Sequence, residues 1–273
     1  MKITVLGLGV MGGSIARSLA AAPDDEVTGW SPDPEERDAA VRVGIPTETT
    51  PVAAVADAHL VVFAIPLGAI RARASEVAEA LRADALVTDL ASLQSPVLKW
   101  AEEVGLAERW ITAHPLTGSE RVGFEASRQG LYTDARVYLS ASEVAPKRAR
   151  EEVRDAWRRA GATPEWIDPA EHDRRMARVS HLPQVVATAL GDALAHLGIH
   201  PDELGPGGRD TTRLAASSPA MWGDLFAHAD PGLGDALREV ARRLEADADA
   251  LERGEVASLV ERLERTGAWR RSR

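Results

Sequence analysis

The sequence predicts an α/β protein in which a parallel-sheet domain is followed by an all-helical domain. Two observations predict this class. Short apolar, β-branched segments alternate with helix-like segments as far as about residue 142, and the pattern beyond residue 143 is almost entirely helical. Alternating strands and helices are typical of a parallel sheet covered on both faces. We therefore expect two domains, at residues 1–168 and 169–273.

The strands expected in the first domain are short and buried. The run from Leu60 to Ile65 is entirely apolar, which is typical of a strand covered on both faces. Strands are expected at Lys2–Leu6, Glu26–Trp30, His59–Ile65, Ala85–Leu90, Trp110–Ala113 and Arg136–Ser140, with a further short one at Thr163–Ile167. Helices are expected between them at Met11–Ala22, Pro34–Val43, Leu67–Leu81 and Ser95–Glu103.

The second domain is expected to contain several helices. Pro169–Leu197 can form one long helix with an apolar stripe, which Pro183 should kink or restart. Pro201–Gly208 is expected to interrupt the helical pattern. A short helix is then expected at Ser218–Ala227, and one or two closing helices at Pro231–Leu263.

Composition excludes several classes of function. The chain of 273 residues has no cysteine, which rules out disulfides, thiolate nucleophiles and sulfur-ligated metals. A net charge of −10 repels nucleic acids. No apolar run reaches the ~20 residues that cross a bilayer, and the first residues lack a signal-peptide pattern. We expect a cytoplasmic protein that binds neither nucleic acid nor membrane.

A glycine-rich segment follows the first expected strand and begins the first expected helix. Gly7, Leu8, Gly9, Val10, Met11 and Gly12 fit the pattern G-x-G-x-x-G. In a Rossmann-type domain the first glycine permits a tight turn, the second lets a pyrophosphate approach the backbone, and the third permits close helix packing. The helix N-terminus adds free N–H donors. These six residues are predicted to bind a dinucleotide.

The choice between NAD and NADP stays open. An acidic residue at the end of the second strand would bind the ribose of NAD, but Ser31 stands at that position. Asp33 can substitute if the turn reaches back, whereas Arg37 can reach a 2′-phosphate or lie on the helix surface.

The segment from Thr112 to Glu120 places a histidine, several hydroxyls and a carboxylate in one loop-like stretch. Histidine titrates near neutral pH, so His114 can take the proton that leaves an alcohol as its carbon gives up hydride. A nucleotide site with such a proton acceptor is typical of a dehydrogenase. No histidine–carboxylate group has metal-ligand spacing, so no metal is expected.

Seven motifs, in this order, resemble those of the prephenate/arogenate dehydrogenase family of tyrosine biosynthesis. They span nearly the whole chain, and their order and spacing are more specific than any one of them. The motifs are Gly7–Gly13, Ala64–Pro66, Thr88–Ser92, His114–Glu120, Glu171–Asp173, Ser180–Pro183, and Arg209–Arg213 followed by Met221-Trp222.

The resemblance implies an NAD- or NADP-dependent oxidative decarboxylation of a cyclohexadiene that carries a ring hydroxyl and a carboxylate. His114 is implied as the acceptor of the hydroxyl proton, with Ser92 orienting it, although Ser92 also suits a helix N-cap. Arg213 is implied to bind the ring carboxylate, since guanidinium binds carboxylate bidentately. Further substrate contacts are implied for Thr117, Ser119, Glu120, His181, Gln184 and Arg209, and further cofactor contacts for Ile65, Pro66 and Asp89.

Gln184 departs from the family pattern, in which many members have histidine there. An amide offers less to the anionic side chain of prephenate and suits the zwitterionic side chain of arogenate, so the residue favours arogenate. The alternative is that Gln184 only packs in a helix and that substrate preference depends on other residues. His172 beside Asp173 is interpreted as a structural pair at a helix start. The resemblance also implies a homodimer formed by the C-terminal helices.

Other functions stay open. A β-hydroxyacid dehydrogenase would share both domains, but Pro169–Leu197 lacks the lysine by which those enzymes resemble one another. An enzyme acting on an amino-substituted prephenate analogue, and a nucleotide-sensing protein without catalysis, are further alternatives.

Overall fold

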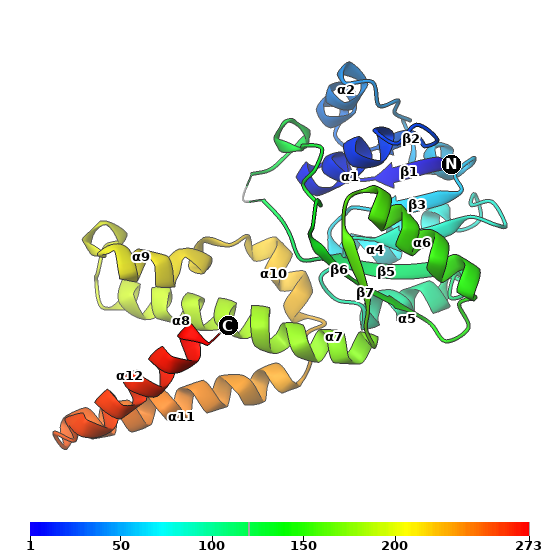
Figure 1. Ribbon diagram of the computed structural model, residues 1–273. Helices are drawn as coiled ribbons and strands as arrows, with labels where there is room; N and C mark the ends of the chain where they lie inside the picture. Colours follow the sequence, from blue (N-terminus) through cyan, green and yellow to red (C-terminus); the bar gives the residue numbers. More distant parts are fainter. Residues whose placement is uncertain (120, 273) are drawn as a thin grey trace. The chain divides into compact units, whose positions relative to one another are not determined.

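The computed structural model describes residues 1–119 and 121–272 (Figure 1). The chain divides into two compact units. The first comprises Met1–Arg175 together with Ser218–Ala229, and the second comprises Met176–Ser217 together with Asp230–Arg273. The fold class predicted from the sequence, a sheet domain followed by a helical domain, is confirmed.

A sheet of seven strands forms the centre of the first unit, in the order β2-β1-β3-β4-β5-β6-β7. The strands β1 to β5 run parallel, whereas β6 is antiparallel to β5 and β7 is parallel to β6. The bounds are β1 Lys2–Leu6, β2 Glu26–Trp30, β3 Leu60–Phe63, β4 Leu86–Asp89, β5 Trp110–Pro115, β6 Arg136–Ala141 and β7 Thr163–Trp166.

The reversal at β6 differs from the parallel sheet that the sequence predicts. Among the described residues between β5 and β6, the helical structure is the short 3₁₀ turn η1 (Phe124–Ala126). A parallel pair needs a crossover of a dozen or more residues, usually a helix, whereas an antiparallel pair does not. The next connection contains α6 (Lys147–Arg159), and β7 accordingly lies parallel to β6.

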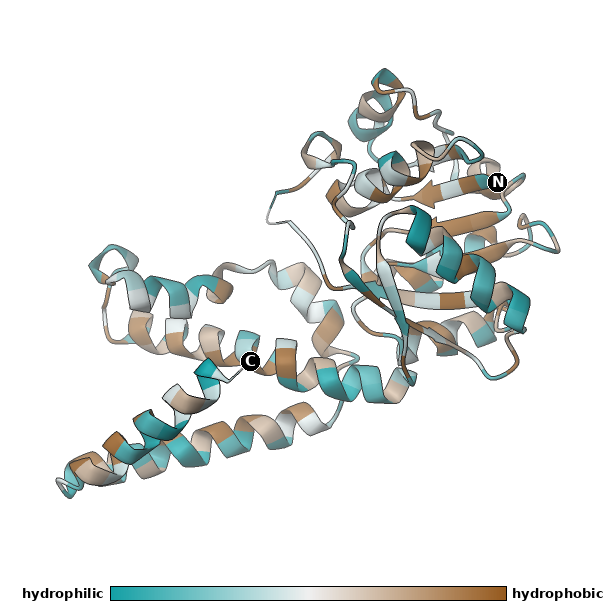
Figure 2. Ribbon diagram, in the orientation of Figure 1, coloured by the Kyte–Doolittle hydropathy of each residue, from teal (hydrophilic) through white to brown (hydrophobic). Residues whose placement is uncertain are grey.

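Helices cover both faces of the sheet, and alternate strand residues supply the two cores. Ile3, Val5 and Val62 face one core, whereas Leu6, Val61 and Phe63 face the other. The first face is covered by α1 (Val10–Ala20), α2 (Pro34–Arg42) and α6; the second by α3 (Pro51–Val55), α4 (Leu67–Val77) and α5 (Ser95–Glu103). The strands are accordingly hydrophobic along most of their length (Figure 2).

Two helices from the region predicted as the helical domain belong to the first unit. They are α7 (Pro169–Met176, of which residues up to Arg175 belong here) and α10 (Pro219–Phe226). Leu225 of α10 is buried in the core of the second face. Asp224 accepts a hydrogen bond from the Gly68 amide, 3.2 Å away, at the start of α4. Burial of Leu225 therefore joins this late segment to the sheet.

The second unit is helical throughout its described part. Its elements are η2 (Ala177–His181), α8 (Leu182–His196), η3 (Pro201–Glu203), α9 (Pro206–Thr212), η4 (Arg213–Ala216), α11 (Gly232–Glu252) and α12 (Val256–Arg271). The turn η2 is a π-helix directly before Pro183. Proline lacks an N–H and clashes with the carbonyl four residues earlier, so a wider turn accommodates it. The interruption expected at Pro201–Gly208 instead contains η3 and the start of α9. None of the described helices is long and apolar enough to cross a membrane.

Candidate active site

The glycine-rich loop lies at the carboxyl ends of β1 and β3, where the strand order reverses direction. Gly7 has a φ of +99°, and a Cβ there would lie 2.3 Å from the Ala64 carbonyl oxygen. A Cβ on Gly12 would lie 1.8 Å from the Gly7 carbonyl oxygen. The fold itself therefore requires both glycines.

Gly9 differs from these two glycines. Apart from its chain neighbours and its own helix, a Cβ on Gly9 would find within 4 Å only the Glu36 Oε1 atom, at 3.8 Å. Open space in front of this backbone is the cradle that a pyrophosphate needs, next to the N-terminus of α1. Leu8 is buried beneath the loop, and Val10 and Met11 begin α1.

The residues after β2 make a compact hydrogen-bonded turn. Ser31 is buried, and its hydroxyl donates to Glu36 Oε2 over 2.5 Å. Asp33 caps α2 by accepting from the Glu35 amide at 2.8 Å. Arg37 donates from Nη1 to the Ser31 carbonyl at 2.5 Å. Glu36 was not among the residues predicted to lie near the cofactor, although its position in the first turn of the helix expected after this strand indicates that it lies near the strand end.

A cavity of about 160 Å³ follows the ends of β3 and β4. It brings together Ile65, Pro66 and Ser92 of the predicted site with Met221 and Leu225 of α10. Ligands of such sheets bind outside the carboxyl ends of the strands, which is where this cavity lies.

Asp89, at the end of β4, is fully buried. Its Oδ2 accepts from Trp110 Nε1 at 2.7 Å, and its Oδ1 accepts from Thr112 Oγ1 and the Ala91 amide at 3.0 Å. Burial raises the pKa of Asp89 to about 6, against the lowering effect of these hydrogen bonds. Asp89 thereby joins β4 and the loop that carries Ser92 to β5.

His114 lies within β5, where it pairs with Tyr138 of β6, and not in a loop as expected from the sequence. Strand pairing up to Pro115 explains the difference. Its Nδ1 lies 2.9 Å from Nε2 of His172, and Nδ1 of His172 lies 2.8 Å from Oδ1 of Asp173. His114 is half-buried, whereas His172 is fully buried. We call these three residues the histidine relay.

Asp173 fixes the inner end of the relay. Its two oxygens accept hydrogen bonds from the Gln94 and Ser95 amides, each at 2.9 Å, at the start of α5. Burial opposes ionisation, but the hydrogen bonds from His172, Ser95 and Gln94 outweigh it and hold the pKa of Asp173 below its usual value. The expected local pair of His172 and Asp173 is therefore extended to His114, a residue that sequence analysis did not join to them.

The loop after β5 contains three more of the predicted residues. Thr117 donates to the Leu131 carbonyl at 3.4 Å, and the Ser119 hydroxyl accepts from the Arg121 amide at 3.0 Å. Glu120 lies outside the described residues.

Four predicted residues belong to the second unit. Gln184 is buried; its Nε2 donates to the Leu214 carbonyl at 2.7 Å and its Oε1 accepts from the Ser217 hydroxyl at 3.2 Å. The amide thereby fixes η4, which begins with the exposed Arg213. His181 is buried at the end of η2, and Arg209 donates to the Asp202 carbonyl at 3.3 Å.

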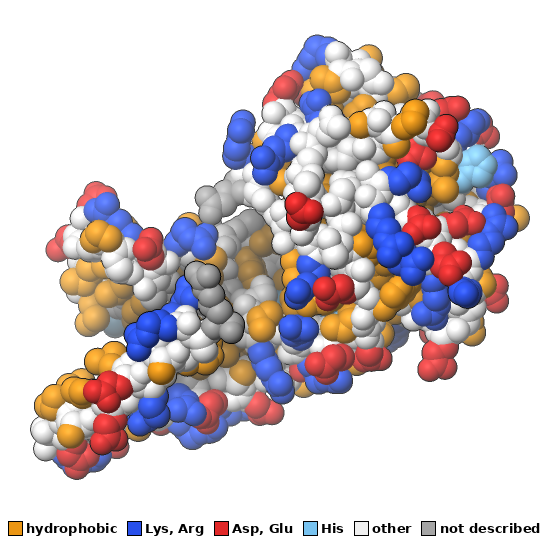
Figure 3. All heavy atoms as spheres, viewed as in Figure 1, with side chains coloured by type: hydrophobic (Ala, Val, Ile, Leu, Met, Phe, Trp, Pro, Cys, Tyr) orange, Lys and Arg blue, Asp and Glu red, His pale blue; other side chains and the backbone are white. Residues whose placement is uncertain are grey.

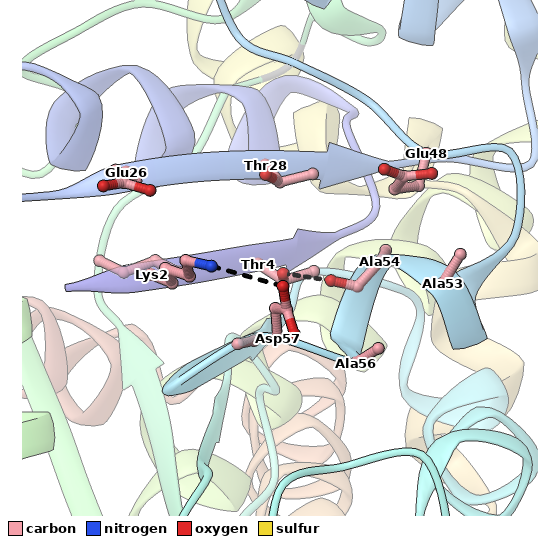
Figure 4. A pocket seen from close by; sticks show the side chains of 11 residues that line it. Lys2, Thr4, Glu26, Thr28, Glu48, Ala53, Ala54, Ala56 and Asp57 are labelled. Carbon is pink, nitrogen blue, oxygen red and sulfur yellow. Dashed lines mark hydrogen bonds and ion pairs between the residues drawn. The ribbon is translucent and has the colours of Figure 1, made fainter.

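A further cavity, of about 370 Å³, contains none of the predicted site residues. It lies along β1 and β2 from their first residues, Lys2 and Glu26, and Lys2 reaches Asp57 across it (Figure 4). The glycine loop lies at the other end of these strands. Among the described residues, no group of three or more histidine, aspartate or glutamate side chains is placed to hold a metal ion.

Comparison with known proteins gives consistent matches. A model described as prephenate dehydrogenase, nucleotide-binding domain, matches residues 15–165, and one described as prephenate dehydrogenase, dimerization domain, matches residues 168–265. The chain is 30% identical to the prephenate dehydrogenase of Bacillus subtilis over 261 residues, which are 90% of this chain and 69% of that protein. It is 30% identical to the cyclohexadienyl dehydrogenase of Zymomonas mobilis over 241 residues, 85% of this chain and 82% of that one.

A solved structure gives the same result. The prephenate dehydrogenase of A. aeolicus, determined in complex with hydroxyphenyl propionate and NAD+, matches with a TM-score of 0.90 and 30% identity, over 99% of this chain and 97% of that one. The resemblance seen in the sequence motifs is confirmed: the chain belongs to the prephenate dehydrogenase family of NAD-dependent oxidoreductases.

Proposed function

We propose that this enzyme oxidises and decarboxylates prephenate or arogenate, with His114 as the acceptor of the ring hydroxyl proton. The histidine relay is the observation that carries the proposal. The relatives' names and the hydroxyphenyl propionate bound to the A. aeolicus enzyme support the substrate class. Prephenate would give 4-hydroxyphenylpyruvate, and arogenate would give tyrosine.

The nucleotide fits the carboxyl edge of the sheet. The open backbone at Gly9 and the N-terminus of α1 would hold the pyrophosphate, and Ile65, Pro66 and Ser92 line the cavity beyond β3 and β4. Bound NAD+ supplies a nicotinamide that accepts the hydride. The protein's own part is to orient the substrate and hold the proton.

Hydrogen bonding in the relay sets the protonation of both histidines. Asp173 is ionised and therefore accepts from His172 Nδ1, which leaves a lone pair on His172 Nε2. That lone pair accepts from His114 Nδ1, so Nε2 of His114 carries the lone pair of a base. A base of this tautomer can take the hydroxyl proton as the C–H bond electrons leave.

The relay also stabilises the charge that forms. Once His114 has accepted the proton, the imidazolium donates towards His172. The negative charge of the Asp173 carboxylate at the far end then stabilises the positive charge on His114. The bond to the ring carboxylate then breaks, CO2 leaves, and its electron pair completes the aromatic ring. The proton on His114 can return to the phenolic oxygen.

Other residues are assigned supporting roles. Ser92 is proposed to orient the ring hydroxyl, and Arg213 to bind the ring carboxylate through its guanidinium. Gln184 is proposed to act through η4, because Leu214 and Ser217 occupy its amide. Asp89 is proposed to position the loop of Ser92 through its bond to the Ala91 amide.

Replacing His114 by asparagine tests the proposal. We expect kcat to fall ~10²–10⁴-fold, because the base is lost. The dissociation constant of NAD+, measured by calorimetry, should stay within about twofold, because the glycine loop is untouched. The control is His196→Asn, at the end of α8, which should leave both quantities unchanged. Near-normal turnover of His114→Asn with prephenate and with arogenate would overturn the proposed role.

A homodimer is proposed from the second unit. The family model that matches residues 168–265 is described as a dimerization domain. Large apolar side chains on α11 and α12 are exposed, which suits a surface that a second copy covers. They include Leu244, Leu251, Val260, Leu263 and Trp269, and hydrophobic side chains are visible along these helices in Figure 3.

A further inference from the structure

The end of β2 lacks the acidic residue that ordinarily binds the adenosine ribose, yet a carboxylate lies close by. Ser31 occupies the expected position and is buried. Its hydroxyl donates to Oε2 of Glu36 over 2.5 Å. Glu36 lies in the first turn of α2, where the cap made by Asp33 begins the helix. The carboxylate is thus brought back to the strand end from a position five residues later.

The second oxygen of Glu36 lies beside the nucleotide cradle. Oε1 is the atom 3.8 Å from the Cβ that would be built on Gly9. In a dinucleotide site the ribose attached to adenine lies beside the pyrophosphate, towards the second strand. The oxygen that Ser31 does not occupy is therefore placed on the ribose side of the glycine loop.

The surrounding charges disfavour a 2′-phosphate. Asp33, Glu35, Glu36 and Glu125 line a neighbouring cavity of about 280 Å³. Arg42, the basic side chain on its lining, pairs with Glu125 at 2.9 Å. A phosphate there would bring between one and a half and two further negative charges close to Glu36.

Two other nearby arginines have partners. Arg37 donates to the Ser31 carbonyl at 2.5 Å. Arg73 lies over the Trp30 ring, 4.6 Å from its centroid, and forms an ion pair with Glu76. These contacts hold both guanidiniums against neighbouring groups, whereas the Glu36 carboxylate lies beside the glycine loop.

We infer that Glu36 selects NAD over NADP. Its Oε1 accepts hydrogen bonds from the 2′- and 3′-hydroxyls of the adenosine ribose, and its charge repels a 2′-phosphate. Ser31 acts as a positioning residue that holds the carboxylate in place. The inference rests on the nucleotide position given under the proposed function, but not on His114.

Binding of two fragments that cannot turn over tests the inference. ADP-ribose and 2′-phospho-ADP-ribose are titrated by calorimetry into the wild-type enzyme and Glu36→Gln. Wild type should bind ADP-ribose ~100-fold more tightly. In Glu36→Gln that ratio should fall at least ~10-fold, because a charged hydrogen-bond acceptor and a repulsive charge are both lost. The matched control is Asp38→Asn, an exposed acid of α2 that does not line this cavity and should keep the wild-type ratio.

A second variant tests the role of Ser31. Ser31→Ala should weaken ADP-ribose binding ~3–10-fold while Glu36 still repels the 2′-phosphate. The inference is overturned if wild type binds both fragments equally, if Glu36→Gln keeps the wild-type ratio, or if Asp38→Asn changes the ratio as much. Because no hydride moves in these titrations, their result is independent of whether His114→Asn abolishes turnover.

Discussion

At the scale of single residues, the histidine relay ends on a buried aspartate. Asp173 is buried and receives two backbone amides besides His172, so it holds both the start of α5 and the tautomer of His172. Its lowered pKa keeps it ionised at neutral pH. A carboxylate in this place can stabilise a protonated His114 without itself taking the proton.

Asp173→Asn should therefore change the pH profile as well as the rate. Asparagine keeps the volume of the side chain but removes the charge. A protonated His114 is then less stable, so the acidic limb of the kcat/KM profile should move to lower pH, and kcat should fall ~10–100-fold because the imidazolium intermediate is less stabilised. Steady-state rates between pH 5 and 9 measure both effects.

The control for this variant is Asp168→Asn, which changes the residue whose side chain accepts from the Glu171 amide at the start of α7. Asp168→Asn should leave the acidic limb of the kcat/KM profile at its wild-type pH. In wild type the ionised Asp173 stabilises the fold at pH values above the usual pKa of aspartate, and this stability is lost as pH falls through the lowered pKa of Asp173. Asp173→Asn is expected to lack this contribution at every pH. A drop in stability with an unmoved limb would mean that Asp173 serves the fold alone.

At the scale of elements, the glycine-rich segment after β1 contains two glycines with different functions, Gly9 at the N-cap of α1 and Gly12 within α1. Gly9→Ala should leave the midpoint of thermal unfolding nearly unchanged, because the added Cβ meets only Glu36 Oε1 at 3.8 Å. It should weaken NAD+ binding by ~10-fold or more, because the methyl group fills the cradle. Gly12→Ala should instead destabilise the fold, because its Cβ would lie 1.8 Å from the Gly7 carbonyl oxygen.

Thermal unfolding and calorimetry on the two variants give the comparison directly. Gly13→Ala is a further reference, since its Cβ would meet side-chain atoms of Phe124 and Ser127 at 2.8 Å rather than backbone. If Gly9→Ala binds NAD+ as wild type does, the pyrophosphate does not approach this backbone and the assigned cradle is wrong.

Elements with a strong local pattern were predictable from the sequence. Lys2–Leu6, Glu26–Trp30 and Ser95–Glu103 have the bounds expected for them. The direction of β6 was not predictable, because it depends on which strand Arg136–Ala141 pairs with and not on its own periodicity. The short helix α3 and the first turn of α9 were missed for a related reason: they are short, and neighbouring elements stabilise them.

Residues of the candidate site were predictable from the sequence only where they belong to a recognisable local motif. The glycine loop and His114 stand out as motifs. The contact between His114 and His172 joins residues 58 positions apart on β5 and α7, and no local pattern reports such a distance. Glu36 was not predicted for another reason. Ser31 stands at the end of β2, where the acidic residue of a dinucleotide site is ordinarily found, and Glu36 lies five residues later.

At the scale of the whole molecule, the chain returns to its first unit after entering the second. α10 buries Leu225 in the sheet core and places Met221 on the cavity that contains Ser92. The lining of that cavity therefore depends on three segments of chain, the last of which lies more than a hundred residues after the second. The first unit would lack part of this lining if the chain were cut at residue 168.

Large apolar side chains are exposed on the second unit, and this makes the dimer testable. Leu263 and Trp269 of α12 are 71% and 74% exposed. We expect wild type to be a dimer by light scattering. The double variant Leu263→Arg and Trp269→Glu should shift it towards monomer at micromolar concentration, because two charges would have to be buried in the interface.

Val144→Arg is the matched control, since Val144 is 59% exposed on the first unit. It should leave the dimer intact, which separates a specific interface from a general effect of added charge. Cofactor binding measured alongside reports whether the first unit stays folded in the monomer. A wild-type monomer, or a double variant that remains dimeric at low concentration, would show that α12 is not the surface that a second copy covers.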